Sequence, residues 1–110
     1  MKLYVAGPYK ASTIFGVIIN IIKARNIAAK LWRMGYTVIC PHANSALTRG
    51  LSDAEWYRRD IELLKNCDGI VMMPGWRKSK GAVGEYVYAR EHGIEIYHWN
   101  GVKKCLLKKK

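Results

Sequence analysis

Short apolar runs and longer amphipathic stretches alternate along the chain. The apolar runs are rich in β-branched and aromatic residues, as strands are, and the stretches between them repeat apolar residues at helical spacing. The predicted strands are residues 2–6, 36–40, 69–73 and 94–98. The predicted helices are residues 13–34, 52–66 and 79–92. Strands joined by helical crossovers pair in parallel, so the pattern predicts a parallel sheet.

Residues at the ends of these elements support the assignment. Gly35 stands where helices commonly end, Ser52 and Glu55 form a capping box, and Pro41 stops the second strand. The apolar runs are continuous, as in strands covered on both faces. We therefore expect an α/β fold, a Rossmann-like or flavodoxin-like three-layer domain with about four parallel strands in the order 2-1-3-4. Ligands of such sheets bind where the winding reverses, here between the first and third strands.

Length and composition fit one small domain. The chain has 110 residues, 50% of them hydrophobic, which is enough for a core. We assign residues 1–100 to the domain and 101–110 to a basic, solvated tail. No apolar run is long enough to span a membrane, and the first is too short for a signal peptide, so we expect a cytoplasmic protein. Cys40, Cys67 and Cys105 form no CxxC pair, which argues against a disulfide framework and a structural zinc.

The net charge of +11 is distributed unevenly. Residues 1–52 contain seven Lys and Arg and no acid, whereas residues 53–102 contain seven basic and eight acidic residues. Residues 103–110 add five lysines. A basic surface attracts phosphate in nucleotides, nucleic acids or acidic membranes, and charge by itself does not choose among them.

The first candidate site segment is the turn Gly7-Pro8-Tyr9 after the first strand. Glycine lets the backbone approach a ligand closely, and the following loop offers N–H groups to an anion. The turn matches neither the GxGxxG fingerprint nor a P-loop, so neither NAD nor a triphosphate is indicated and we expect no cofactor. The alternative interpretation is an ordinary turn at the end of a strand.

The second candidate is Asp60. Its helix has a stripe of apolar residues at helical spacing, formed by Tyr57, Ile61, Leu64 and Cys67. Asp60 falls inside this stripe, whereas the other charged residues of the helix fall outside it. An acid on an inward face has to be paired, protonated or functional, because burying a lone charge is costly. The alternative is a structural pair with a basic side chain or a helix amide.

The third candidate is the run SKGAVGE, from Ser79 to Glu85. We expect Ser79 to cap the third helix, whose N-terminus attracts anions. Glu85 has small residues one turn before and after it, so we expect its carboxyl to face open space. Gly81 and Gly84 each cost the helix about 1 kcal/mol, which close approach of a ligand explains; tight helix–strand packing is the alternative. Together with Asp60, Glu85 gives the paired carboxylates of glycosidic bond cleavage, and no HExxH spacing indicates a metal.

One pattern joins three segments: YVAGPY, YRRDIELLKNCDGIVMMPGW and SKGAVGEYVYAREHGIEIY. Over residues 2–98 this pattern resembles the nucleoside 2-deoxyribosyltransferase superfamily, which includes deoxyribonucleoside 5′-monophosphate N-glycosidases. The match is to an uncharacterised bacterial and phage branch. The Ser-x-Gly-x-x-x-Glu motif, with an acidic helix and a strand before it, is moderately specific.

The resemblance implies roles for the candidate residues. The family's nucleophile falls on Glu85, and its helper acid falls on Asp60. Where the deoxyribosyltransferases have Asp, this chain has Ser79; the monophosphate glycosidases have a phosphate-contacting Ser there, which implies a phosphorylated substrate. The implied reaction is attack of Glu85 on the anomeric carbon, loss of the base and a glycosyl-enzyme intermediate, resolved by water or by a second base.

Two more side chains are candidates for contact with the base. His42 follows the second strand, with a surface loop histidine as the alternative, and Trp76 follows the third strand, with plain packing as the alternative. The expected substrate-binding residues are Gly7, Pro8, Tyr9, Ser79, Gly81, His42 and Trp76.

The stretch 14–22 is more apolar than a solvent-facing helix, which indicates either a subunit interface or a deep core contact. The resemblance implies a homodimer or a higher homo-oligomer. We therefore expect an enzyme, a hydrolase or a transferase, that acts on a nucleoside or nucleotide, with nucleic acid as a further partner of the basic surface and with no membrane partner. The alternatives are a non-catalytic nucleotide-binding module and a basic nucleic-acid-binding protein.

Overall fold

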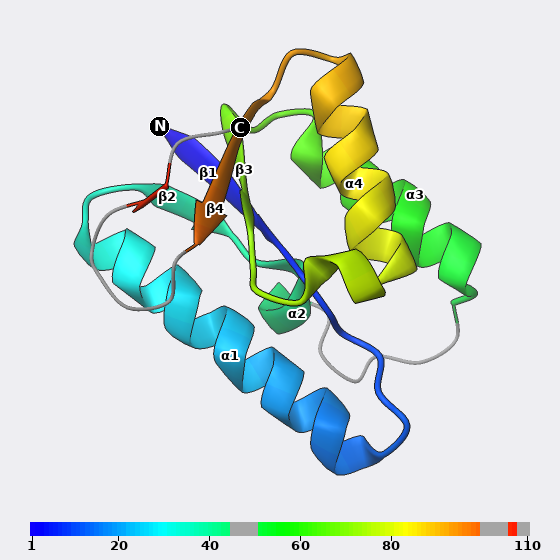
Figure 1. Ribbon diagram of the computed structural model, residues 1–110. Coiled ribbons are helices and arrows are strands. Elements are labelled where there is room, and N and C mark those ends of the chain that lie inside the picture. Colours follow the sequence, from blue (N-terminus) through cyan, green and yellow to red (C-terminus); the bar gives the residue numbers. More distant parts are fainter. Residues whose placement is uncertain (45–50, 100–105, 108–110) are drawn as a thin grey trace.

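The computed structural model describes residues 1–44, 51–99 and 106–107 (Figure 1). The strands are β1 (Lys2–Ala6), β2 (Thr37–Ile39), β3 (Gly69–Met72), β4 (Glu95–Trp99) and β5 (Leu106–Leu107). The helices are α1 (Ile14–Arg33), α2 (Pro41–Asn44), α3 (Asp53–Leu64) and α4 (Lys80–Glu91), and the 3-10 turn η1 covers Trp76–Lys78. The four predicted strands and three predicted helices are all present, with ends that differ by no more than two residues.

The sheet has the strand order β2-β1-β3-β4-β5. The first four strands are parallel, so the predicted order 2-1-3-4 is confirmed. β1 lies between two neighbours, with Leu3 paired to Val38 of β2 and to Gly69 of β3. β5 pairs with β4 in the antiparallel direction. The sequence pattern did not predict β5, because two leucines next to lysines are too short a run to indicate a strand.

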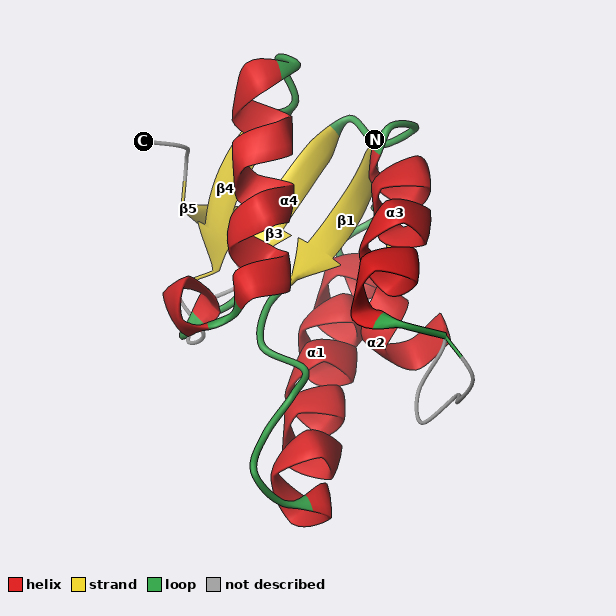
Figure 2. Ribbon diagram, turned by 90° about the vertical axis from the view of Figure 1, so that its right-hand side faces the viewer, coloured by secondary structure: helices red, strands yellow, loops and turns green. Residues whose placement is uncertain are grey.

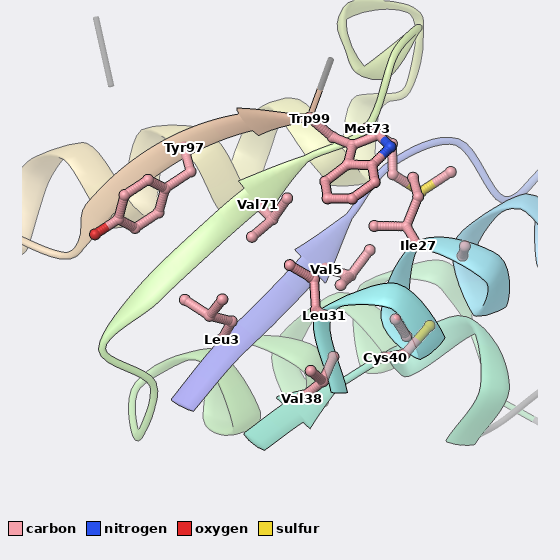
Figure 3. Close-up of a cluster of buried hydrophobic side chains, with 12 residues drawn as sticks. Leu3, Val5, Ile27, Leu31, Val38, Cys40, Val71, Met73, Tyr97 and Trp99 are labelled. Atoms are coloured by element: carbon pink, nitrogen blue, oxygen red, sulfur yellow. The ribbon is translucent and has the colours of Figure 1, made fainter. Parts of the chain in front are cut away.

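Helices cover both faces of the sheet (Figure 2). Side chains alternate along β1, so that Leu3 and Val5 lie in the core under α1, while Tyr4 and Ala6 lie in the core under α3 and α4. Figure 3 shows the first of these cores, in which Leu31 of α1 lies beside Leu3 and Val5 of β1. The three-layer α/β architecture is thus confirmed.

α1 is longer than the sheet that it covers. Its 20 residues span about 30 Å, whereas the five residues of β1 span about 17 Å. All of its buried residues lie from Ile21 onward, so its N-terminal half projects beyond the carboxyl edge of the sheet (Figure 2). Thr13 caps this projecting end, because its Oγ1 accepts a hydrogen bond from the N–H of Gly16 at 3.1 Å. At the other end, Gly35 has a left-handed φ of 98°, as its place after the helix predicted.

The capping box of α3 is confirmed. The Oγ of Ser52 accepts from the N–H of Glu55 at 3.2 Å, and the Oε1 of Glu55 accepts from the N–H of Ser52 at 2.8 Å. The predicted buried stripe is present at Leu64 and wrong at Tyr57, which is 37% exposed. The ring of Tyr57 lies over Gly84 of α4 instead, where a Cβ atom would be 3.0 Å from its Cζ.

The short helix α2 was not predicted. Pro41 ends β2 as expected, and it also begins α2, because the fixed φ of proline suits the first turn of a helix. Cys40 and Cys67 are buried, and Cys105 lies outside the described residues. Among the described helices, none combines the length and the apolar character that crossing a membrane requires.

Candidate active site

The loops that follow β1 and β3 meet at the carboxyl edge of the sheet. A Cβ atom on Gly75, in the loop after β3, would lie 3.6 Å from the Cγ of Pro8, in the loop after β1. Gly75 has a φ of 86°, a left-handed conformation that favours glycine. The two loops therefore adjoin at the point where the winding of the sheet reverses and where a ligand was expected.

Glu85 lies on α4 with its carboxyl directed at the sheet. The residue is only 6% exposed, and the hydroxyl of Tyr4 donates a hydrogen bond to its Oε2 at 2.7 Å. Burial raises the pKa of Glu85 to about 8; the Tyr4 hydrogen bond acts to lower it, and the charge of Asp60 acts to raise it. The carboxyl of Glu85 is therefore mostly protonated at neutral pH.

The expectation that Glu85 faces open space is wrong. Its small neighbours Ala82 and Ala89 are buried in the core between α4 and the sheet. Because these side chains are short, the helix packs closely on the sheet, and the Glu85 carboxyl lies within hydrogen-bonding distance of Tyr4 on β1.

Asp60 lies on α3, beside α4 and on the same side of the sheet (Figure 2). The residue is partly exposed, and burial raises the pKa of its carboxyl to about 6. Its charge also raises the pKa values of Glu85 and Tyr4, so the three groups share one electrostatic environment. Within the described ranges no ion pair involves Asp60.

Tyr4 completes this group, and the sequence analysis did not identify it. Its side chain is fully buried in β1, on the face that α3 and α4 cover. Burial raises the pKa of the phenol well above its ordinary value, and the carboxyls of Glu85 and Asp60 raise it further, so the hydroxyl stays a donor. The available signal was a tyrosine inside an apolar strand, since a buried tyrosine hydroxyl usually has a polar partner.

Close packing against Met73 explains why a glycine stands at position 7. It is buried, and a Cβ atom there would lie 2.6 Å from the Cβ of Met73, which follows β3. The space that was expected to admit a ligand is thus filled by the methionine side chain. The turn nonetheless carries Pro8 and Tyr9 to the edge of the sheet, where both are partly exposed.

His42 supports this turn from within the protein. The residue lies on α2 and is buried, so the interpretation as a surface loop histidine is wrong. Its Nε2 donates to the carbonyl oxygen of Pro8 at 2.8 Å, and its ring meets that of Tyr9 edge-on with centroids 5.6 Å apart. Burial lowers the pKa of His42, so the imidazole is neutral and holds the backbone of the turn.

Ser79 caps α4 as predicted, because its Oγ accepts from the N–H of Ala82 at 3.2 Å. Gly81 in the first turn is exposed, and a Cβ atom there would meet nothing closer than the Ser79 Oγ at 4.0 Å. Gly84 differs, because the ring of Tyr57 fills the space beside it. One glycine therefore serves the packing of α3 on α4, while Gly81 borders open space.

Trp76 lies in the core rather than at the open edge. It is buried, its ring stacks on Tyr86 with centroids 4.7 Å apart, and the guanidinium of Arg77 lies 4.6 Å from the ring centre. The ring is engaged within the protein, so plain packing describes it better than stacking on a base.

The groups gathered on one side of the sheet suit proton transfer and nucleophilic attack. Two carboxyls differ in proton affinity, and a phenol donates to one of them. Within the part of the chain that the structure describes, no group of three or more His, Cys, Asp or Glu side chains is placed to hold a metal ion.

A comparison with known families assigns the chain to one of them. A family model matches residues 1–98 of the chain. The chain belongs to the DUF4406 family. That family is defined as a domain of unknown function, so membership of it assigns no reaction. No curated protein sequence matches the chain.

Solved structures of other proteins share the fold of this DUF4406 domain. One is a 2-deoxyribosyltransferase from the psychrotolerant bacterium Bacillus psychrosaccharolyticus, characterised as a biocatalyst for the synthesis of nucleosides. It superposes with a TM-score of 0.65 at 21% identity, over 89% of this chain and 71% of its own. A conserved protein from Enterococcus faecalis superposes with a TM-score of 0.60 at 18% identity, over 88% of this chain and 61% of its own. At these identities the similarity establishes the fold.

In the DUF4406 domain, then, Glu85 of α4, Asp60 of α3 and Tyr4 of β1 all lie on the side of the sheet that α3 and α4 cover. Pro8 and Ser79 stand on loops that reach the carboxyl edge of the sheet. Gly7 and Trp76 serve packing, and His42 holds the turn after β1 through its hydrogen bond to Pro8.

Proposed function

We propose that this protein cleaves the N-glycosidic bond of a nucleoside or a nucleoside 5′-monophosphate, with Glu85 as nucleophile and Asp60 as proton carrier. The strongest support is the pair of neighbouring carboxyls with separate pKa values, about 8 for Glu85 and about 6 for Asp60. Glycosidic bond cleavage through a covalent intermediate uses two carboxyls with different proton affinities. The shared fold with a 2-deoxyribosyltransferase supports a nucleoside as the substrate class.

The protonation states suggest how the pair works. Between about pH 6 and pH 8 it holds one proton, on Glu85, while Asp60 is ionised. Glu85 gives this proton to Asp60, and its oxygen forms a bond to the anomeric carbon as the bond from that carbon to the base nitrogen breaks. Asp60 passes the proton to the departing nitrogen, so the base leaves neutral. Water or a second base then attacks the anomeric carbon as its bond to Glu85 breaks. Asp60 takes the proton that the attacking group loses and returns it to the Glu85 carboxylate, which restores the starting state.

Tyr4 positions the nucleophile. Its hydroxyl fixes one oxygen of the Glu85 carboxyl, Oε2, by the hydrogen bond of 2.7 Å. The same bond lowers the pKa of Glu85 and so offsets part of the cost of ionising a buried carboxyl.

We assign the 5′-phosphate to the first turn of α4. Gly81 borders open space there, Ser79 caps the helix, and the basic residues around the turn are exposed; they are Arg77, Lys78 and Lys80. Backbone N–H groups at a helix N-terminus and cationic side chains both attract an anion. A 5′-monophosphate should therefore bind more tightly than its nucleoside, by about 1.5–3 kcal/mol.

The test is a panel of nucleosides and 5′-monophosphates assayed for free base by chromatography. The parent should release base, and Glu85→Ala should release none while it remains folded. Glu91→Ala is the matched control, because it removes an exposed carboxyl from the same helix and should keep the parent rate. A Glu85→Ala variant as fast as the parent would exclude Glu85 as nucleophile. Nucleotide binding without release of any base would identify a non-catalytic binding module.

The same assay has an expected pH profile. A singly protonated pair gives a bell-shaped dependence of kcat/KM on pH. The rate should fall below about pH 6, where Asp60 is protonated, and above about pH 8, where the pair has lost the proton that the leaving base needs.

A further inference from the structure

Side chains from two helices hold the backbone of the loop after β1. The side-chain amide of Asn20, in the projecting half of α1, donates to the carbonyl oxygens of Tyr9 and Lys10 at 3.1 and 3.5 Å. The Nε2 of His42, on α2, donates to the carbonyl oxygen of Pro8 at 2.8 Å. Three consecutive carbonyls of an irregular segment thus have side-chain donors, as a loop of fixed shape requires.

The projecting half of α1 supports this loop along its length (Figure 2). A Cβ atom on Gly16 would lie 2.5 Å from the Cβ of Ala11, so the end of the loop packs closely on the first turn of the helix. Asn20 lies one turn further on and is partly buried. A helix that ended with the sheet would not carry Asn20 to the loop, which gives the extra turns of α1 a purpose.

The same loop borders the elements that carry the two carboxyls. Pro8 adjoins Gly75 in the loop after β3. Lys10 forms an ion pair with Asp53 in the first turn of α3, the helix of Asp60. Both partners of this ion pair are about three-quarters exposed, and such pairs contribute little to stability. The shape of the loop therefore depends mainly on the donors from α1 and α2.

We propose that Asn20 and His42 are positioning residues, which hold the loop after β1 in the shape that receives the substrate. The role rests on the proposed function, because the ligand is the nucleoside or 5′-monophosphate of that reaction. A loop that is fixed before binding loses less conformational entropy when the ligand arrives. Both side chains act through the loop backbone, so their removal should weaken binding rather than slow the bond-breaking step.

The first test is ¹⁵N relaxation of the backbone amides by NMR, which needs no ligand. The amides of Tyr9 and Lys10 should have order parameters of about 0.85 in the parent and below about 0.6 in Asn20→Asp, since Asp has no N–H to donate. Asn26→Asp is the matched control, because it adds the same charge at an exposed position of α1 and should keep the loop ordered. A loop that is mobile in the parent, or equally ordered in Asn20→Asp, would overturn the proposal.

The second test is the kinetics of base release from a 5′-monophosphate. Asn20→Asp and His42→Leu should raise KM by about 10–100-fold while kcat stays close to that of the parent. His42→Gln should lie closer to the parent than His42→Leu, because the Gln amide can donate to the carbonyl of Pro8. A merely structural role would reduce the folded fraction, which lowers kcat and leaves KM unchanged. That result, with circular dichroism as the measure of folding, would overturn the proposal.

The proposed reaction and the positioning role fail in different experiments. A parent that releases no base would refute the reaction, and the affinity for the 5′-monophosphate by calorimetry then takes the place of KM. Asn20→Asp should weaken that affinity by the same factor, and Asn26→Asp should not. A parent that binds no monophosphate would overturn the role in substrate binding, whatever the order parameters of the loop.

Discussion

Replacing Glu85 by Gln should stabilise the protein, and increasingly so as the pH rises. The fold raises the pKa of Glu85 from 4.5 to about 8. The unfolded chain loses this proton from about pH 4.5, whereas the folded protein keeps it to about pH 8, so the parent loses stability across that window. Gln has no proton to lose, and its amide oxygen can still accept the hydrogen bond of Tyr4.

The size of the effect follows from the two pKa values. Each pH unit between them corresponds to about 1.36 kcal/mol for one proton. Integrated over the titration, the stability advantage of Glu85→Gln over the parent should grow by about 3–4 kcal/mol between pH 5 and pH 8. Domains are stable by about 5–15 kcal/mol, so the gain is a large share of the total.

The assay is urea unfolding at pH 5, 6, 7 and 8, followed by tryptophan fluorescence. Parent, Glu85→Gln and the matched control Glu91→Gln are compared at each pH, because Glu91 is an exposed carboxyl on the same helix. Only Glu85→Gln should show a free energy of unfolding that increases relative to the parent as the pH rises. A constant difference between Glu85→Gln and the parent from pH 5 to pH 8 would show that the fold does not retain the Glu85 proton.

Two further substitutions test the surroundings of the site. Tyr4→Phe removes the hydrogen bond that lowers the pKa of Glu85. The alkaline limb of the kcat/KM profile should therefore move to higher pH, and the maximal rate should fall. A limb that stays in place would show that Tyr4 does not set the pKa of Glu85. Gly7→Ala should destabilise the fold by about 1–3 kcal/mol in thermal unfolding, because its Cβ meets Met73. Gly81→Ala is its control, since it adds a methyl group in open space and should stabilise α4 by up to about 1 kcal/mol; equal effects of the two substitutions would contradict the packing argument.

Local signals predicted most of the fold. Ser52, Ser79 and Gly35 each act within a few residues of their own positions, and all three mark helix ends in the structure. The parallel strand order followed from the alternation of strands with helices, because crossovers restrict the order in which neighbours can pair.

The surroundings of the candidate site depend on residues far apart in the chain, and the sequence pattern could not predict them. Glu85 was expected in open space because its helical neighbours are small, but the side chain that covers it, Tyr4, lies 81 residues away. Gly7 was assigned to a ligand because glycine lets the backbone approach one closely, but Met73, which follows the neighbouring strand β3, fills that space. Trp76 was predicted to contact a base because it follows the third strand, but its ring stacks on Tyr86 and is buried.

The position of β1 between β2 and β3 has a consequence for folding during synthesis. β1 precedes the other described strands of the sheet in the chain, yet one of its two neighbours, β3, begins only at Gly69. The N–H of Lys2 donates to the Oδ2 of Asp68 at 2.8 Å, across 66 residues. Pairing between such distant segments is slow.

A nascent chain that has not yet released β3 from the ribosome therefore leaves one edge of β1 unpaired. Such an edge is a template for association with other chains, so this stage invites aggregation or binding by chaperones. Glu85 lies on α4 and emerges later still, so the hydroxyl of Tyr4 lacks its hydrogen-bond acceptor until α4 is made. The pairing of β1 with β3 and the contact of Tyr4 with Glu85 are therefore complete only after α4 has emerged.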